Sequence, residues 1–245
     1  MSIVFISNRS NMKNLAISTL ILSSLLISSC YEEDPGPRQT DSRTFAVMDY
    51  DRIEAGDALI LTIKQGNTYS IQAVGDRRNL DDLLVYKNGN TLVLRYHHNE
   101  KRQYGTSITI TSPDLTGFNF SGAVNGKISG FTHVSKFDLS LSGASLAQME
   151  MDATELNFSL SGASQLLLNG LGEKLQGTIS GASLLSAFDF LSAEAKLTAS
   201  GASNGKVNVS SQLDVNASGA SLIIYKGNPQ LEVDASGESV VKPAN

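Results

Sequence analysis

The tetrapeptide Ser161-Gly162-Ala163-Ser164 decides the fold of this 245-residue chain, because the sequence repeats it at a nearly constant distance. The first copy, Ser121-Gly122-Ala123-Val124, and the last, Ser236-Gly237-Glu238-Ser239, are divergent. The first serine of each copy advances in steps of 21, 19, 19, 20, 18 and 18 residues. A repeat this short cannot bury its own hydrophobic face, so it must stack on its neighbours, and the sequence predicts a solenoid. The seven copies begin at Ser121, Ser142, Ser161, Ser180, Ser200, Ser218 and Ser236.

The residues that flank each tetrapeptide alternate between apolar and polar. The apolar residues Leu156, Phe158 and Leu160 precede the third copy. The residues between them, Asn157 and Ser159, are polar. A period of two is typical of a strand with one buried face. Each coil is therefore predicted to contain a strand, a tight corner, a second strand and a variable connector that absorbs the differences in length.

Equivalent strands of successive coils are expected to pair in parallel, about 4.8 Å apart. The sequence thus predicts an all-β fold, a parallel β-helix with 18–21 residues per coil. We expect a right-handed coil, because parallel crossover connections are overwhelmingly right-handed. The alternative is a sandwich of antiparallel strands joined by turns at similar spacing. The near-constant motif disfavours it, because the loops of a sandwich rarely repeat in sequence.

Each corner places a glycine where the backbone is expected to need a positive φ, which only glycine reaches without a Cβ penalty. The alanine beside it keeps stacked corners from clashing. The serine hydroxyls are expected to form a ladder that satisfies corner carbonyls. The predicted structural glycines are Gly122, Gly143, Gly162, Gly181, Gly201, Gly219 and Gly237.

The composition excludes some classes of protein. The formal net charge is −5, and the chain has one cysteine and no tryptophan. Neither a basic stripe nor an alternation of aromatic and basic residues is present, so nucleic acid is not expected as a partner. A single cysteine excludes an intramolecular disulfide.

That cysteine, Cys30, follows a sequence typical of a lipoprotein signal. Lys13 supplies a positive charge, and residues 15–27 form an apolar stretch too short to span a bilayer. The sequence Leu-Ile-Ser-Ser-Cys that ends at Cys30 resembles a lipobox. We therefore predict that residues 1–29 are a signal peptide, with Met12 as an alternative start, and that Cys30 is lipidated and anchors the protein to a membrane. The alternative is a free, buried cysteine behind an ordinary signal sequence.

Residues 30–44 are expected to be a flexible tether, because they are rich in proline, glycine and charge. The acidic residues Glu32, Glu33 and Asp34 resemble the surface-export signal of Bacteroidetes-type lipoproteins. The alternative is a solvated linker.

Residues 45–245 are predicted to form a single β-helix domain, in which residues 113–245 are the repeat coils. Residues 45–112 lack the tetrapeptide but keep the alternation of strands. We expect three or four less regular coils there, which cap the N-terminal end, and the alternative is a separate small β domain. The charged run from Arg77 to Asp82 is expected to lie in one loop.

Several stretches resemble the family called "putative auto-transporter adhesin, head GIN domain", found in Bacteroidetes lipoproteins. An opening strand at residues 45–53 leads to Leu59–Gly66 (LILTIKQG). Asn90–Leu94 (NTLVL) follows, and Ile108–Leu115 (ITITSPDL) continues into Phe120–Ala123 (FSGA). The resemblance covers residues 45–240, and it implies a β-helical fold and a cell-envelope setting.

Motifs of catalysis and metal binding are weak. Ser203 with Lys206, and Ser239 with Lys242, match the Ser-x-x-Lys of serine acyl-enzymes, but they lie on a corner and a strand and not on a helix. His97 and His98 point to opposite faces if they lie on a strand, and His133 is alone. We therefore expect no catalytic residue, no cofactor and no metal.

Outward-facing carboxylates are the remaining candidates for chemistry. Asp138, Asp214, Glu232 and Asp234 are expected to form a loose column on one strand face, with Asp214 and Glu232 one coil apart. Adjacent coils would give them the separation that glycoside chemistry needs. No histidine, lysine or arginine is expected beside them, so a solvated face is the favoured interpretation.

The sequence therefore predicts a non-enzymatic, lipid-anchored protein of the cell envelope that acts as an adhesin-like binding or structural module. A glycan or an extracellular protein is the expected ligand. The expected location is the outer membrane, at the cell surface or facing the periplasm. The alternatives are a β-helical polysaccharide lyase or hydrolase, and a periplasm-facing lipoprotein for assembly or sensing.

Overall fold

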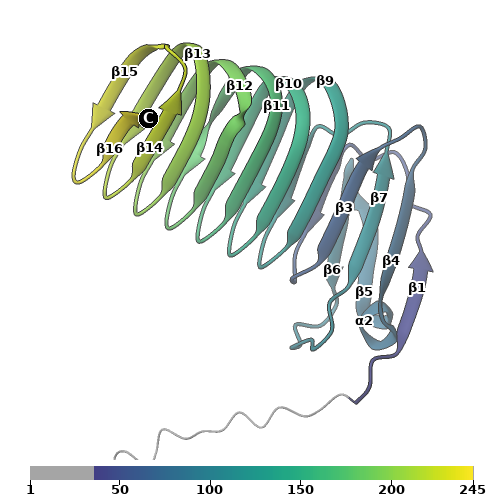
Figure 1. Cartoon of the computed structure of the whole chain (residues 1–245). Helices are drawn as coiled ribbons and strands as arrows, with labels where there is room; N and C mark the ends of the chain where they lie inside the picture. The colour runs from purple at the N-terminus through teal and green to yellow at the C-terminus, as the bar shows by residue number, and fades with distance from the viewer. Residues whose placement is uncertain (1–35, 245) are drawn as a thin grey trace, which may run out of the picture. The chain divides into compact units, whose positions relative to one another are not determined.

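The computed structural model describes residues 36–244, and Arg38–Asn245 form one compact unit. Cys30, Glu32, Glu33 and Asp34 lie outside the described residues, as does the predicted signal peptide. The compact unit is a β-solenoid of about seven turns that follow one another about 19 residues apart (Figure 1). The predicted parallel β-helix is therefore confirmed.

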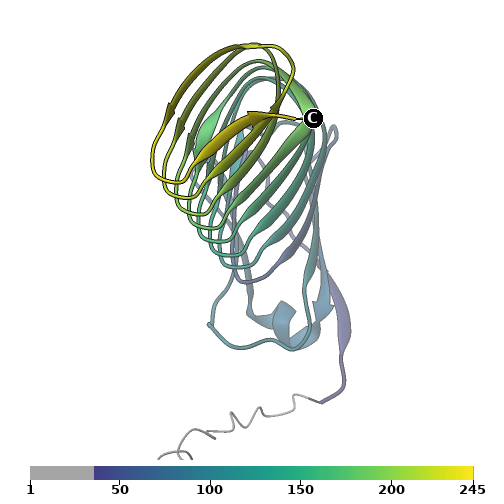
Figure 2. The same ribbon diagram turned by 60° about the vertical axis from the view of Figure 1, so that its left-hand side comes forward.

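The regular coils are built from long strands that pair in parallel. Leu156 pairs with Phe137 of the coil before it and with Leu175 of the coil after it, and all three side chains are fully buried. Because apolar residues fall on apolar residues in this way, the coils overlap as flattened rings (Figure 2) around a packed interior. The strands are β9 (Asn125–Leu141), β10 (Leu146–Leu160), β11 (Gln165–Ile179), β12 (Leu184–Ala199), β13 (Asn204–Ala217), β14 (Leu222–Lys226), β15 (Gln230–Ala235) and β16 (Val240–Pro243).

The corners stack as closely as the strands do. All seven corner glycines have φ between 69° and 74°. The amide of Ala182 donates to the carbonyl oxygen of Gly162 at 2.7 Å, and this bond recurs from coil to coil. The second serine of the tetrapeptide is buried inside the corner, where Ser203 Oγ donates to the carbonyl oxygen of Ile179 at 3.2 Å. The hydroxyls of Ser164 and Ser183 lie 3.3 Å apart, and other buried corner hydroxyls donate to backbone carbonyl oxygens, as Ser145 does to Ser142.

The variable connector predicted between the two strands of a coil is absent from the regular coils. Each coil from β9 to β13 instead continues as one bent strand of 14–17 residues between corners. The register shifts inside these strands, for example between Leu167 and Asn169 and between Ala187 and Leu191. The differences in repeat length are therefore absorbed by β-bulges, which keep the backbone paired.

The stacking order departs from the chain order at the N-terminal end. Strand β2 (Arg52–Ala55) lies between β6 (Thr91–Tyr96) and β8 (Gly117–Phe120). Strand β3 (Ile60–Gln65) lies between β7 (Ser107–Ser112) and β9. The coil that comes first in the sequence is thus inserted between the coil of β6–β7 and the coil of β8–β9.

The remaining N-terminal strands correct two predictions. Strand β1 (Thr40–Thr44) pairs antiparallel with β4 (Ser70–Asp76), so the last five residues of the predicted tether belong to the sheet. Strand β4 pairs antiparallel with β7, and β5 (Leu83–Asn88) with β6. Only two irregular coils, β2–β3 and β6–β7, pair in parallel, and not the three or four predicted. The strands β1, β4 and β5 pair antiparallel instead.

The charged run predicted as a loop is a short helix, α2 (Arg77–Asp82). Its N-cap residue, Asp76, is buried and accepts hydrogen bonds from the amides of Gln39 and Arg78 and from the Arg78 guanidinium. Hydrogen bonds from Arg78, helped by the Gln39 amide, outweigh burial and hold the pKa of Asp76 well below its ordinary value. Asp76 is a residue type that favours the N-cap of a helix, and this signal for α2 was not used in the prediction.

The packed core thins at the C-terminal end. Leu231 of β15 is 43% exposed, whereas its register partner Leu213 in β13 is fully buried. Within residues 36–244, β15 and β16 each pair with a strand on one side only.

Candidate functional site

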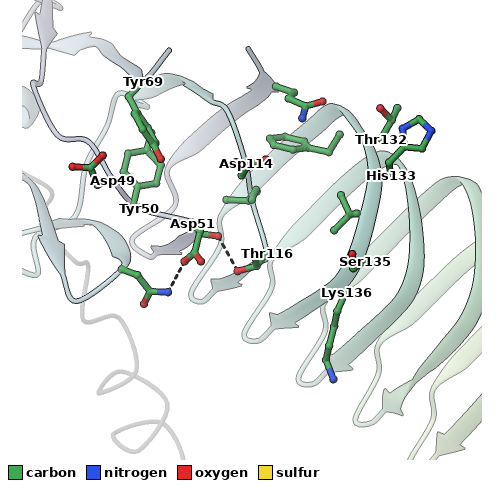
Figure 3. A pocket seen from close by; sticks show the side chains of 15 residues that line it. Asp49, Tyr50, Asp51, Tyr69, Asp114, Thr116, Thr132, His133, Ser135 and Lys136 are labelled. Carbon is green, nitrogen blue, oxygen red and sulfur yellow. Dashed lines mark hydrogen bonds between the residues drawn. The ribbon is translucent and has the colours of Figure 1, made fainter. Parts of the chain in front are cut away.

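A hollow of about 750 Å³ opens where the irregular coils meet β9 (Figure 3). It lies at the end of the coils that is opposite the glycine corners. Residues 49–51 before β2, Tyr69 before β4, residues 114–116 before β8 and residues 131–136 at the bend of β9 line it. We call it the Tyr69 hollow.

Two tyrosines form its aromatic part. The rings of Tyr50 and Tyr69 are tilted by 57°, with centroids 4.9 Å apart. Tyr50 is 1% exposed, and its hydroxyl has no hydrogen-bond partner among residues 36–244. Burial, followed by the neighbouring Tyr69, raises the pKa of Tyr50. An unsatisfied buried hydroxyl is costly, so this atom marks a place where a bound group would add stability.

Three carboxylates surround the half-buried Tyr69. Burial is the first cause that raises the pKa of Tyr69, and the negative charges of Asp49, Asp114 and Asp51 raise it further. Asp49 has a φ of 60°, a left-handed conformation that is uncommon outside glycine. None of the three carboxylates forms an ion pair within the described part of the chain.

The backbone of the loop that carries Asp51 is held by hydrogen bonds. The amide and hydroxyl of Thr116 donate to the carbonyl oxygen of Asp51 at 2.7 and 3.1 Å. The Asn90 amide donates to Asp51 Oδ1 (Figure 3). These bonds fix the position of the loop and leave the second carboxylate oxygen of Asp51 without a protein donor among residues 36–244.

The opposite wall comes from the bend of β9. His133 has a φ of 59°, so the bend is a sharp turn of the strand. Lys136 Nζ lies 2.9 Å from Glu155 Oε1 on the next coil, and the hydrogen bond from Lys136 to Glu155 raises the pKa of the lysine. Glu155 thus compensates Lys136, and a second ammonium group lies beside the hollow, because Lys87 Nζ donates to the carbonyl oxygen of Asp49 at 3.2 Å.

The regular coils show a different electrostatic pattern, in which charges on adjacent coils pair with each other. Lys136 pairs with Glu155, Lys174 lies 3.7 Å from Glu194, and Lys196 Nζ lies 2.8 Å from Asp214 Oδ2. The register of the parallel strands places these residues side by side. Three ion pairs between adjacent coils therefore lie along the outer face of the repeats, which also carries exposed carboxylates without an ion pair among residues 36–244, such as Glu150 and Asp189.

The predicted column of carboxylates is present only in part. Asp214 and Glu232 are register partners, as predicted, and Asp234 is the partner of Asn216. Asp138 lies several coils away, next to Asn157. The expectation that no basic residue stands beside the column was wrong, because the parallel register places Lys196 against Asp214.

Arg52 also approaches Asp138, at 3.9 Å. Arg52 belongs to the inserted coil of β2, so no local sequence pattern predicts this contact.

The other candidates are structural. Ser203 is fully buried in a corner, whereas Lys206 is exposed on the outer face, so the two do not act together. Ser239 Oγ donates to the carbonyl oxygen of Ser236 at 2.7 Å. The ring of His98 contacts Asp82, which also contacts Arg102. Among residues 36–244, no group of three or more histidines, cysteines or acidic residues is placed to hold a metal.

Sequence reasoning missed the residues of the Tyr69 hollow. Asp51 and Thr116 are 65 residues apart in the chain. Asp49, Tyr69 and Asp114 belong to different connections, and no spacing pattern joins them. Only the insertion of the β2–β3 coil brings these connections to one place.

Comparison with known proteins places the chain in a family. The sequence profile described as "putative auto-transporter adhesin, head GIN domain" matches residues 49–229. The chain belongs to this family. The resemblance inferred from the sequence is therefore confirmed, and the matched region includes all residues that line the Tyr69 hollow and the repeats as far as β14. A search of curated proteins found no match.

Solved structures share the fold of this adhesin-like family. A crystal structure named a putative adhesin from Bacteroides fragilis is 21% identical, with a TM-score of 0.77 over 85% of this chain and 98% of that chain. One named a putative lipid binding protein from Parabacteroides distasonis is 18% identical, with a TM-score of 0.70 over 84% and 97%. One named a putative adhesin from Parabacteroides merdae is 16% identical, with a TM-score of 0.67 over 84% and 97%. At these identities the likeness establishes the fold.

Over residues 36–244, we find no helix with the length and apolar character needed to cross a membrane.

Proposed function

We propose that this protein is a non-enzymatic binding module of the cell envelope, held at the outer membrane by a lipid on Cys30 and exposed at the cell surface. Its ligand is a glycan or an extracellular protein. Membership in an adhesin-like family supports the envelope setting and the binding role. The lipobox that ends at Cys30 and the acidic residues Glu32, Glu33 and Asp34 support the anchor and its orientation.

The Tyr69 hollow carries this proposal, because it combines a concave shape, an aromatic lining and three carboxylates. On the repeats, cross-coil pairs such as Lys196 with Asp214 neutralise one another. In the hollow, the carboxylates of Asp49, Asp51 and Asp114 gather around an accessible tyrosine without such pairing in the described residues. Free charge beside an aromatic ring in a concave site is typical of a binding site.

The electrostatics of the repeats speak against a glycoside hydrolase. A general acid needs a raised pKa. Hydrogen bonds from Asn157 and then from Lys136 lower the pKa of Glu155 instead. Asp214 forms an ion pair with Lys196. These carboxylates are suited to ion pairing along the rod.

The test is an array of glycans and matrix proteins probed with the full chain in detergent, beside an assay for the release of reducing ends from polysaccharides. We expect saturable binding on the array and no release of reducing ends. Cleavage of a polysaccharide that is lost in the double variant Asp214→Asn/Glu232→Gln would instead support the β-helical enzyme.

A further inference from the structure

We propose that the Tyr69 hollow binds the ammonium or guanidinium group of a lysine or arginine side chain on a protein partner. This inference rests on the proposed function and names the chemistry that the site recognises.

The charge of the hollow favours a cation. Asp49, Asp51 and Asp114 contribute three carboxylates, and the one lysine in the lining, Lys136, is compensated by Glu155. A cation that enters meets three carboxylates that form no ion pair among residues 36–244, and the nearby Lys87 donates to the backbone carbonyl of Asp49 and not to a carboxylate. The attraction is stronger in a concave site than on an open surface, because less water screens it.

The hydrogen-bonding capacity of the hollow favours a group that only donates. Three side-chain donors of its lining are already used: Asn90 Nδ2 donates to Asp51, Thr116 Oγ1 to the Asp51 carbonyl, and Gln65 Nε2 to the Pro113 carbonyl. Carboxylate oxygens remain as acceptors. Lysine and arginine side chains have donors and no acceptors, whereas sugar hydroxyls need both. The carboxylates of the site, which only accept hydrogen bonds, are therefore suited to a cationic side chain.

The tyrosines supply a second and independent observation. Tyr50 lines the hollow, is 1% exposed, and has a hydroxyl that no described residue satisfies. Its oxygen can accept a hydrogen bond from an ammonium or guanidinium group. Tyr69 stands beside it (Figure 3) and offers the face on which organic cations bind.

A metal ion fits less well than an organic cation. No three acidic, histidine or cysteine residues of the described chain are close enough to share one ion. A guanidinium or alkylammonium group is larger and can contact carboxylates that are further apart.

The experiment measures binding of small probes to the full chain in detergent, by saturation-transfer NMR and by tyrosine fluorescence, which no tryptophan obscures. The cationic probes are the Nα-acetyl methylamides of lysine and arginine. The corresponding norleucine derivative is the uncharged match. Glucosamine and N-acetylglucosamine test whether an amino sugar or a neutral sugar is preferred.

The variants remove charge while keeping shape. The triple variant Asp49→Asn/Asp51→Asn/Asp114→Asn keeps the left-handed residue tolerable, because asparagine adopts positive φ readily. The single variant Asp114→Asn, at an exposed position, guards against a folding defect in the triple variant. The control Glu150→Gln/Asp189→Asn removes two exposed carboxylates from the middle coils.

We expect the lysine and arginine probes to bind and the norleucine probe not to bind. The triple variant should weaken binding by on the order of tenfold or more, and added salt should weaken binding to the wild type. Asp114→Asn should give a smaller loss, and the control variant none.

Three results would overturn the inference: equal binding of the norleucine probe, tighter binding of glucosamine or N-acetylglucosamine, or wild-type affinity in a folded triple variant. Its failure is distinguishable from that of the proposed function. An array ligand that the triple variant still binds refutes the cation site alone. Cation binding without any array ligand refutes the proposed function alone.

Discussion

The carbonyl oxygen of Gly162 lies 2.5 Å from the position that a Cβ atom on Gly181 would occupy. Gly181 is on the next coil and has a φ of 71°. The contact is with backbone, which cannot swing aside as a flexible side chain can. The two coils can therefore stack this closely only because residue 181 has a hydrogen atom in place of a Cβ atom.

Gly181→Val should destabilise the fold strongly. We expect about 1–3 kcal/mol from the left-handed backbone and about 1–3 kcal/mol from overpacking. Thermal unfolding followed by circular dichroism measures the effect. Gly89→Ala is the matched control, because Gly89 also has a positive φ but has nothing within 4 Å of its Cβ position. If both variants melt like the wild type, the corner is not a stacking element.

Ser180→Ala should cost less, about 1 kcal/mol. Ser180 Oγ donates to the carbonyl oxygen of Leu160 at 3.1 Å, and that carbonyl also accepts from the Ser180 amide at 2.9 Å, so one bond remains. The measurement is the same unfolding experiment, run beside the array. A variant that is fully stable yet has lost ligand binding would show that the serine row serves function.

Asp76→Asn should destabilise the N-terminal sheet and flatten its dependence on acid. The lowered pKa of Asp76 means that its contribution to stability is present above its ordinary unfolded value, near 4, and is lost as the pH falls toward the lower folded value. The difference between the wild type and Asp76→Asn should therefore be largest near pH 7 and should shrink below about pH 4. Denaturant unfolding at pH 7 and pH 3 measures it. A difference that stays constant over this range contradicts the assignment.

The thiol of Cys30 should carry acyl chains after the signal peptide is removed. The apolar run and the small residues before Cys30 are the basis of this expectation. Mass spectrometry of the mature N-terminus, compared with a Cys30→Ser variant, is the test. An unmodified Cys30, or cleavage at another position, refutes the lipid anchor.

Replacement of Glu32, Glu33 and Asp34 by alanine should retain the protein on the inner side of the outer membrane. Protease treatment of intact cells should remove the wild type and spare the triple alanine variant. Equal removal of both proteins shows that these acidic residues do not direct export.

The repeats were predictable because their signals are local and recur. The glycine of each corner indicates a backbone with positive φ, and the alternation of apolar and polar residues around Phe158 indicates a strand with one buried face. The pairing of Lys196 with Asp214 was not predicted, because it depends on the register between two coils and not on a local pattern.

The sequence by itself determined the parallel β-solenoid and its corners, since each coil repeats the same local requirement for a glycine at positive φ and a buried apolar face. Only the tertiary structure decided that the coil of β2–β3 inserts between β6–β7 and β8–β9. Strands distant in the chain compete for the same edges, and the choice depends on how side chains from both partners fit, which no local pattern encodes. That choice brought Asp49, Tyr69 and Asp114 together against the bend at His133, and so created the Tyr69 hollow.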